Sequence, residues 1–368
     1  MTHEEYRNAL ENAIYLTACA VNGEKPDRDR VDVMAIDPLY HAAQQHLLTS
    51  IVAYALKSAG VENEAFRQAQ AKAMRKNALF DADRSALCKE LEAAGIWYMP
   101  LKGSVLKDLY PRYGMRQMAD NDILFDPDRA EDVKVIMESL GFTAEHFGAG
   151  NHDCYQKPPV SNFELHRSLF STAHEDKLYW YYKDVKDRLV KDEGNLFGWH
   201  FTDEDFYVYM VAHEYKHYSG GGTGLRSLLD TYVYLKQKTA LDSSYIEEES
   251  QRLGLAAFER ENRTLALHLF DGEPLSQQEQ QMLDYILFAG TYGTMENRVR
   301  NQVNKLGRLG YLWSRAFLPL KTMKTLYLVL ERAPVLLPVC WVIRWGKALL
   351  FNRKIAAFQL RAALGLKK

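Results

Sequence analysis

The sequence has few cysteines and no long apolar run, and both features argue against whole classes of protein. The four cysteines lie far apart and form no Cys-x-x-Cys pair, so neither a disulfide framework nor a thiolate zinc site is indicated. The longest apolar run near the carboxyl end, Ala333–Ile343, has 11 residues and contains two prolines, about half of the ~20 residues that a membrane-spanning helix needs. The first residues lack the basic start and the apolar core of a signal peptide, so a cytoplasmic protein is expected.

A balanced total charge hides an uneven distribution. The 368 residues carry a net charge of −2, but residues 291–368 contain 15 Lys or Arg and only two acids, which gives +13 there and −15 for residues 1–290. Seven aromatic residues, from Trp313 to Phe358, are mixed with these charges. We therefore expect helices from about Arg298 to Lys368 that contact an anionic surface. The chain's own acidic body, a membrane surface and nucleic acid all fit, and we favour packing against the body.

Apolar periodicity divides the chain into four parts, and the length allows two or three domains. Apolar residues recur at three- and four-residue steps in Glu4–Val21, Leu39–Ala59 and Glu62–Ala94, which predicts helices, with a loop at Asn22–Asp37. Helical patterns return after Ser168. We predict a helical subdomain over residues 1–95, an α/β core over 96–167, a second helical subdomain over 168–290 and a basic, aromatic helical tail over 291–368.

The predicted core, residues 96–167, alternates between strand and helix patterns. The predicted strands are Ile96–Leu101, Met118–Phe125, Phe142–Phe147, Asp153–Lys157 and Val160–His166, and the predicted helices are Val105–Tyr110 and Arg129–Leu140. Such an order requires a mixed sheet. The predicted fold class is therefore α+β, a small mixed β-sheet core flanked by amino- and carboxy-terminal helical subdomains.

Acidic residues lie in two of these strands. Asp120 and Asp122 are two residues apart, so their side chains project from the same face, and two adjacent carboxylates repel unless a cation lies between them. Glu164 lies between apolar residues in a later strand. Earlier in the chain, the turn Lys102-Gly103-Ser104 follows an apolar run. Ser104 could cap the helix that follows, and helix N-termini favour anions, so this turn is a candidate phosphate cradle.

Together these residues resemble the nucleotidyltransferase superfamily, whose core is the polymerase-β-like fold. The sequence more closely resembles a bacterial family of uncharacterised nucleotidyltransferases, in which a Lys-Gly turn, an Arg before Asp-x-Asp, and a late Glu-Leu-His recur. The matching residues are Lys102-Gly103, Arg116, Asp120-x-Asp122 and Glu164-Leu165-His166. The resemblance covers about residues 90–170 and implies a nucleotidyltransferase core.

The resemblance implies a two-metal transfer of a nucleoside monophosphate from a nucleoside triphosphate to an acceptor hydroxyl, with release of pyrophosphate. Asp120, Asp122 and Glu164 would be the catalytic residues and would hold Mg²⁺ or Mn²⁺, because hard cations prefer oxygen ligands. Lys102 and Arg116 would neutralise the triphosphate, although a structural salt bridge is equally open for Arg116. The nucleotide and the acceptor, a small molecule, a protein or an RNA end, stay open.

A competing motif lies further along the chain. Residues 213–217 read His-Glu-Tyr-Lys-His and satisfy H-E-x-x-H, so His213 and His217 could hold zinc on one helix face, with Glu214 as general base. Thr223 stands where the longer metzincin signature has its third histidine. A zinc metallopeptidase is therefore one alternative function.

The resembled family also has helices with histidines at this spacing, followed by Gly, Arg and Asp, which Arg226 and Asp230 match here. On that resemblance the acceptor side of the site would include His166, His213, His217, Arg226 and Asp230. A second alternative is a catalytically degenerate nucleotide-binding or regulatory module. It rests on Asn121, because the superfamily usually has an apolar residue between the paired acids.

Overall fold

The computed structural model describes residues 1–148, 150–171, 176–291, 293–351 and 353–364. The chain forms two compact units. The first unit comprises Met1–Glu214 and Gly224–Leu287, and the second comprises Tyr215–Thr223 and Phe288–Lys368. Across the described ranges, no helix has both the length and the apolar character that crossing a membrane requires.

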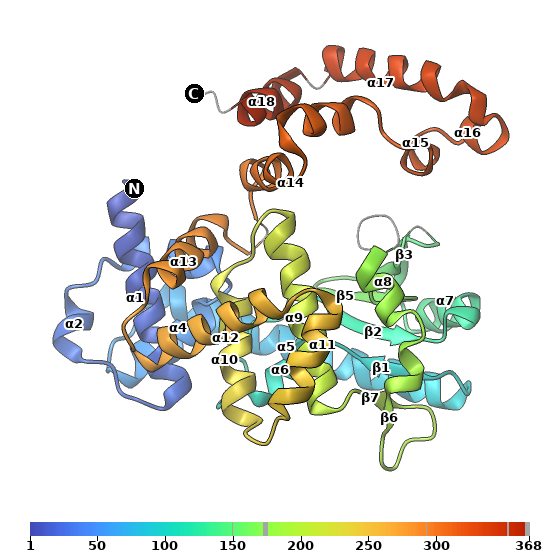
Figure 1. Cartoon of the computed structure of the whole chain (residues 1–368). Helices are drawn as coiled ribbons and strands as arrows, with labels where there is room; N and C mark the ends of the chain where they lie inside the picture. Colours follow the sequence, from blue (N-terminus) through green and yellow to red (C-terminus); the bar gives the residue numbers. More distant parts are fainter. Residues whose placement is uncertain (149, 172–175, 292, 352, 365–368) are drawn as a thin grey trace. The chain divides into compact units, whose positions relative to one another are not determined.

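A five-stranded mixed sheet lies in the first unit (Figure 1). Its strands are β1 (Tyr98–Pro100), β2 (Asn121–Phe125), β3 (Thr143–His146), β4 (His152–Lys157) and β5 (Ser161–His166), in the order β1-β2-β5-β4-β3. Strands β2 and β5 are parallel, and the other neighbours are antiparallel. The mixed sheet with helical flanks confirms the predicted α+β class.

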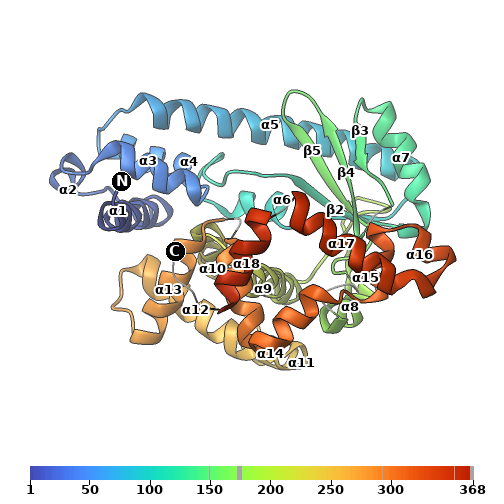
Figure 2. The same cartoon turned by 90° about the horizontal axis from the view of Figure 1, so that it is seen from above.

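The sheet has one apolar face and one polar face. Side chains alternate along a strand, so Ile123 and Phe125 of β2 pack with Phe163 and Leu165 of β5 in one buried cluster. Helices α5 (Glu64–Ala93) and α7 (Ala130–Ser139) cover this face and contribute apolar side chains to the cluster. Figure 2 shows α5 extending along the sheet. The intervening residues of β2 and β5 therefore point away from the cluster.

The predicted strand Met118–Phe125 is three residues too long, because β2 begins at Asn121. Asp120 therefore precedes the strand instead of lying inside it. The predicted helix Leu39–Ala59 is two helices, α3 (Ile36–Gln45) and α4 (Thr49–Ser58), separated where Leu47 has a positive φ of 57°. A short helix, α2 (Arg28–Asp32), interrupts the predicted loop Asn22–Asp37.

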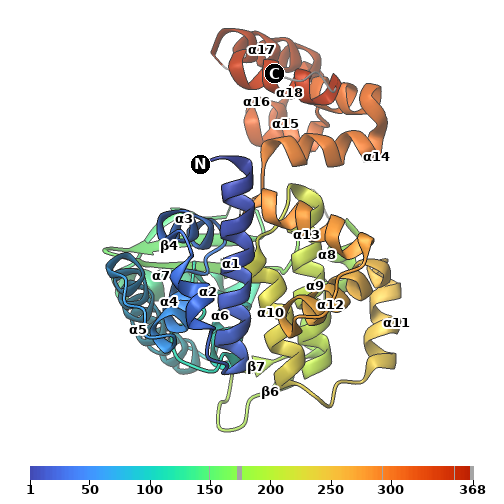
Figure 3. The same cartoon turned by 90° about the vertical axis from the view of Figure 1, so that its left-hand side faces the viewer.

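Helices from distant parts of the sequence complete the first unit. Helix α1 (His3–Asn22) begins at a capping box, because the Thr2 side chain accepts from the Glu5 N–H while the Glu5 side chain accepts from the Thr2 N–H. It packs against α3, α4 and α12 (Ala256–Asp271) (Figure 3). The later elements are α8 (Asp176–Tyr182), the β6–β7 ribbon (Val190–Lys191, Trp199–His200), α9 (Asp203–Gly220), α10 (Leu225–Gln237), α11 (Ser243–Leu253), α12 (Ala256–Asp271) and α13 (Gln277–Ala289).

The second unit is helical, as predicted for the basic tail. Its helices are α14 (Met295–Ala316), α15 (Leu320–Leu326), α16 (Val329–Arg332), α17 (Leu337–Phe351) and α18 (Arg353–Leu364), with a 3-10 turn at Pro334–Leu336. Two small buried clusters stabilise it. Val299, Tyr311 and Ala363 join α14 to α18. A second cluster around Met323, Leu330 and Cys340 joins α15, α16 and α17.

Candidate active site

The parallel pairing of β2 and β5 places two acidic residues side by side. Asp122 is the register partner of Glu164, and Leu124 is the partner of His166. All four side chains point to the face opposite the apolar cluster, because Ile123 and Leu165 point into that cluster. The pairing of β2 with β5 therefore brings together Asp122 from β2 and both Glu164 and His166 from β5.

Asp122 is the centre of this group and is only 2% exposed. Its Oδ1 accepts hydrogen bonds from Lys102 Nζ at 2.6 Å and from His166 Nε2 at 2.8 Å. Burial opposes the charge, but Lys102 and His166 outweigh it and hold the pKa of Asp122 well below its usual range. For Lys102 the negative charge of Asp122 likewise outweighs burial and raises the pKa. Asp122 and Lys102 thus form an ion pair in which the carboxylate is buried and the lysine is half-buried.

His166 is neutral at pH 7, because burial and the nearby charge of Lys102 lower its pKa to about 4. Its Nε2 donates to the Asp122 carboxylate, so Nδ1 carries the lone pair. This Nδ1 is buried and has no hydrogen-bond partner among the described residues. His152 is the register partner of His166 on β4, with ring centroids 5.2 Å apart, and its Nε2 lies 3.9 Å from Glu164 Oε1. His152 was missed in the sequence because only strand pairing places it here.

The negative charges of the other two carboxylates, Asp120 and Glu164, are less well balanced by nearby positive charge. Burial, followed by the negative charges of Asp122 and Glu164, raises the pKa of Asp120. Burial and Asp122 also raise the pKa of Glu164. Lys102 Nζ is 2.6 Å from Asp122 but 3.9 Å from Glu164 Oε2. The positive charge of Lys102 therefore stands against the three carboxylates Asp120, Asp122 and Glu164. The excess negative charge would stabilise an additional cation here.

One set of residues fits a metal ion. Asp122, Glu164 and His166 each offer a ligand atom, and these atoms all lie within 4.8 Å of one another. Within the described ranges this is the sole group of three or more such residues with metal-ligand spacing. The expected set was Asp120, Asp122 and Glu164, so the geometry brings His166 in and leaves Asp120 just outside.

The turn that precedes α6 (Gly103–Leu106) differs from its predicted arrangement. Lys102 occupies the N-cap position with a positive φ of 49°, which is rare for a side chain that is not glycine. Ser104 does not cap the helix, because its Oγ donates to the carbonyl of Leu101 at 2.6 Å and the residue is buried. The predicted helix Val105–Tyr110 begins earlier, at Gly103, and is α-helical only to Leu106, after which a 3-10 turn continues to Leu109.

Close packing explains why residue 103 is a glycine. A Cβ at this position would lie 2.5 Å from Nη1 of Arg116 and about 3 Å from the thioether of Met118. The glycine therefore allows the Arg116 guanidinium to pass against the backbone of the turn. Any larger residue would push Arg116 away.

Arg116 forms a bidentate ion pair with Asp230 of α10. Nε donates to Oδ1 at 2.7 Å and Nη2 to Oδ2 at 2.8 Å, and the Tyr110 hydroxyl donates to the same Oδ1 at 2.7 Å. All three residues are buried. Arg226 donates from Nη1 to the carbonyl of Gln117. Arg116 and Asp230 thus fasten the segment before β2 to α10, and these donors of Arg116 are used inside the protein.

Asn121 faces away from the carboxylates. It is fully buried, its Nδ2 donates to the carbonyl of Phe80, and its Oδ1 accepts from Arg84, both on α5. The polar residue between the paired acids therefore connects β2 to α5. It does not enter the polar face.

The H-E-x-x-H segment lies on α9, and its glutamate points into the protein. Glu214 is 4% exposed and accepts from Asn262 at 2.9 Å and from Thr231 at 3.3 Å. Burial raises its pKa to about 7. His213 is half-buried and His217 is exposed. Because Glu214 faces α10 and α12, it is not placed to act as the base of a zinc site on α9.

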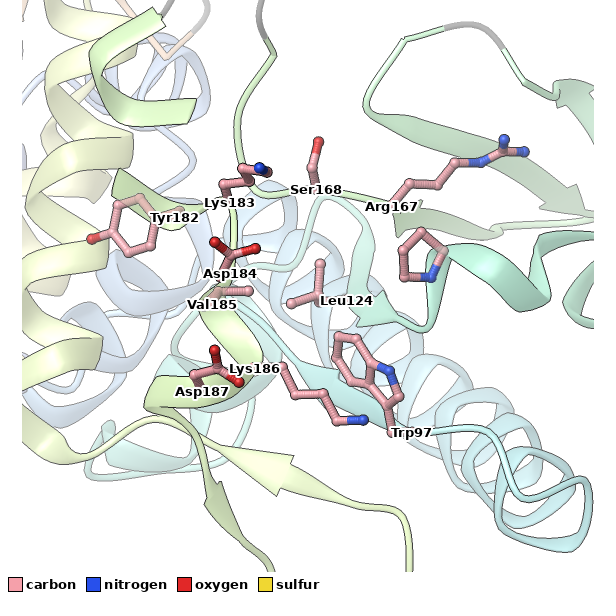
Figure 4. Close-up of a pocket in the computed structure, with 11 residues that line it drawn as sticks. Trp97, Leu124, Arg167, Ser168, Tyr182, Lys183, Asp184, Val185, Lys186 and Asp187 are labelled. Atoms are coloured by element: carbon pink, nitrogen blue, oxygen red, sulfur yellow. The ribbon is translucent and has the colours of Figure 1, made fainter. Parts of the chain in front are cut away.

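A cavity of about 220 Å³ lies next to β2 (Figure 4). Leu124 lies in its lining, two residues after Asp122 and on the same face of β2. The full lining is Trp97, Leu124, Pro127, Arg167, Ser168, Tyr182, Lys183, Asp184, Val185, Lys186 and Asp187. Lys186 Nζ lies 5.0 Å from the centre of the Trp97 ring, whereas the Arg167 guanidinium turns away to pair with Asp153. The cavity thus offers an aromatic wall, two lysines and two aspartates, and Leu124 connects it to the strand that carries Asp122.

Comparison with known proteins gives a family match. A family model described as uncharacterised nucleotidyltransferase matches residues 33–271. No curated protein matches the sequence. Among solved structures, the chain is similar to an antigenic nucleotidyltransferase-like protein from Paracoccidioides brasiliensis, at 14% identity over 53% of this chain and 94% of that chain. The TM-score of 0.34 is too low for that structure to support an argument.

Proposed function

The chain belongs to the family of uncharacterised nucleotidyltransferases, and on this premise we propose that it moves a nucleoside monophosphate from a nucleoside triphosphate to an acceptor hydroxyl, releasing pyrophosphate. The observation that carries the proposal is the register of β2 and β5, which pairs Asp122 with Glu164 on the polar face of the sheet. Asp120 lies two residues before Asp122, directly before the first residue of β2. Three carboxylates at one sheet edge suit phosphoryl transfer, where positioning and charge stabilisation do most of the work.

Asp122 and Glu164 would hold the divalent cation, with Asp120 and His166 completing its surroundings. Two carboxylates and an imidazole accept Mn²⁺, and the carboxylates alone suit Mg²⁺. When bound, such a cation stabilises the charge that develops on the phosphoryl oxygens and lowers the pKa of the attacking hydroxyl. The position of His166 Nε2 supports this assignment, because it lies 2.8 Å from Asp122 Oδ1 and 3.7 Å from Glu164 Oε2, and in the tautomer protonated at Nδ1 it would offer its lone pair to the cation.

The chain's own residues supply charge and proton transfer. Lys102 keeps Asp122 ionised and is the cation closest to the carboxylates, so it is our candidate for contact with the triphosphate. Glu164 has a side chain that is 30% exposed and a raised pKa, which suits it to take the proton of the acceptor hydroxyl. The adjoining cavity with Trp97 and Lys186 is our candidate place for the acceptor. Arg116 takes a structural role in this proposal, since Asp230 uses its bidentate donors.

Two observations weigh against the alternative functions. A degenerate binding module rested on Asn121, and its contacts with α5 give that residue a structural purpose that leaves the carboxylates intact. A zinc peptidase needs Glu214 beside the metal, and that side chain is hydrogen-bonded to Asn262 and Thr231 in the interior. If the purified chain cleaved proteins and a chelator stopped the cleavage, the zinc peptidase would again be the better hypothesis.

A screen for pyrophosphate release tests the proposal. The full chain is incubated with each nucleoside triphosphate and Mg²⁺ or Mn²⁺, with a metabolite extract as the source of acceptors. Glu164→Gln should abolish the release. Glu145→Gln is the matched control, because Glu145 is exposed on β3 of the same sheet and should leave the rate unchanged. Release that persists in Glu164→Gln would remove this residue from the mechanism.

A further inference from the structure

Helix α17 of the second unit presents an apolar face to solvent. We name this surface the α17 face, and its members are 45–83% exposed: Val335, Val339, Val342, Ile343, Leu350 and Phe351. Val335 lies in the turn that leads into the helix, and the others recur at helical steps along one side. Single exposed apolar residues are ordinary, but a continuous row along a helix marks a contact surface.

The opposite side of α17 is fixed to the second unit. Cys340 is buried against Met323 and Leu330. The indole N–H groups of Trp341 and Trp345 donate to the carbonyls of Leu318 and Ala316, both at distances below 3 Å. These contacts set the rotation of the helix, so the outward direction of the α17 face is a property of the packed unit.

The sequence that contains this face is strongly basic. Residues 291–368 carry 15 Lys or Arg against two acids. On the helix itself, Arg344 donates to the carbonyl of Arg315 at 2.8 Å, and Lys347 is exposed with its Nζ 5.3 Å from the centre of the Tyr327 ring. Apolar side chains next to a cationic surface form the pair of signals that stable attachment to an anionic bilayer needs.

We propose that the α17 face docks on the surface of an anionic phospholipid membrane. The 15-residue helix is about 22 Å long, shorter than the ~30 Å hydrocarbon core, so it would lie in the plane of the interface. The exposed Val, Ile, Leu and Phe side chains enter the boundary of the acyl chains, and the surrounding Lys and Arg contact the headgroups. This inference does not depend on the proposed nucleotidyl transfer.

The other anionic partners fit the surface less well. Single-stranded nucleic acid binds by stacking successive bases on a series of aromatic rings, but Phe351 is the one aromatic member of the α17 face, and the indole N–H groups of Trp341 and Trp345 are turned inward to backbone carbonyls. A second copy of the chain would bring two surfaces of the same strong positive charge together. An acidic protein surface, including the chain's own body, would pair with the basic residues. It would not by itself cover the exposed aliphatic side chains of the α17 face.

Vesicle co-sedimentation of the full-length chain tests the proposal. The vesicles are phosphatidylcholine alone and phosphatidylcholine with about a third phosphatidylglycerol, at about 0.15 M and 0.5 M salt. We expect binding to the anionic vesicles, at least tenfold weaker binding to the neutral ones, and a marked loss at high salt because charges at the surface are screened.

Paired variants separate the apolar contribution from the charge. Val339→Gln with Val342→Gln removes apolar surface without changing charge and should weaken binding to anionic vesicles at least tenfold. Val135→Gln is the matched control, since Val135 is 65% exposed on α7 of the first unit and should bind like the parent. Phe351→Gln, at the end of the helix, is a second test should the double variant fail to fold by circular dichroism.

The proposal is overturned by any of three results. These are no binding to anionic vesicles, equal binding by the parent and the α17 variants, or binding to single-stranded RNA in place of vesicles. A concentration-dependent dimer in light scattering that the double variant abolishes would assign the face to a second copy instead.

Discussion

The substitution of asparagine should have different effects on stability at two neighbouring aspartates, although it should reduce activity at both. Asp122→Asn and Asp120→Asn each replace a carboxylate by an amide of the same shape, and both should reduce nucleotidyl transfer by ~10²–10³ or more, because each removes a preorganised charge. Their effects on stability should differ. Asp122 is paired with Lys102 at 2.6 Å, whereas Asp120 lies in the negative field of Asp122 and Glu164.

The size of the difference follows from these contacts. Removing one partner of a buried ion pair costs about 3–5 kcal/mol of stability. In Asp122→Asn, Lys102 would still have the negative charge of Glu164 at 3.9 Å. We therefore expect the lower end of the range, about 3 kcal/mol, for the metal-free protein. Asp120→Asn relieves repulsion and should leave the free energy of unfolding unchanged or raise it by about 1 kcal/mol. At roughly 2–4 °C per kcal/mol, thermal unfolding separates the two variants clearly.

The pH dependence gives an independent check. The folded-state pKa of Asp122 is below the ordinary value of 3.8, so its stabilising contribution is complete above that pH and is lost as the pH falls below it. The folded-state pKa of Asp120 is above 3.8, so its destabilising contribution is absent at acidic pH and grows as the pH rises from 3.8 through the folded-state value. Equal destabilisation by both variants at pH 7 would refute this account of the charges. An Asp122→Asn protein with the parent rate would remove Asp122 from the mechanism.

Three further predictions concern other residues. Glu164→Gln should abolish pyrophosphate release while nucleotide binding, measured by fluorescence titration, stays within a fewfold of the parent, because in the proposed transfer this carboxylate would serve the acceptor. Burial raises the pKa of Glu214 from 4.5 to about 7, so the parent should lose about 3 kcal/mol relative to Glu214→Gln as the pH rises from 4.5 to above 7. Urea unfolding at both pH values checks this, and a pH-independent difference would contradict it. Asp230→Asn leaves Arg116 buried without its carboxylate and should cost about 3–5 kcal/mol, whereas Arg116→Met with Asp230→Leu should recover most of that loss in the same assay.

The sequence determined the sheet and the acidic group because both follow from short-range rules. Alternation along a strand puts Asp122 and Leu124 on one face and Ile123 on the other, and this period is visible in the residues themselves. The order of strand and helix patterns predicts a mixed sheet, whereas the parallel pairing that places Glu164 beside Asp122 joins strands that β3 and β4 separate in the chain. The basic, aromatic tail was likewise visible in the composition and in the helical period.

The tertiary structure decided which of these polar residues meet. The Arg116–Asp230 pair joins positions 114 residues apart, and no local pattern links them. Glu214 and Asn121 have the same motif spacing whether they face a site or the interior, and packing against α10, α12 and α5 turned both inward. Lys102 reaches Asp122 because the backbone of its turn adopts a positive φ, a choice that the Gly-Ser pattern does not encode. Periodicity acts between near neighbours, whereas a hydrogen-bond partner is chosen by the burial of groups that only the completed fold brings together.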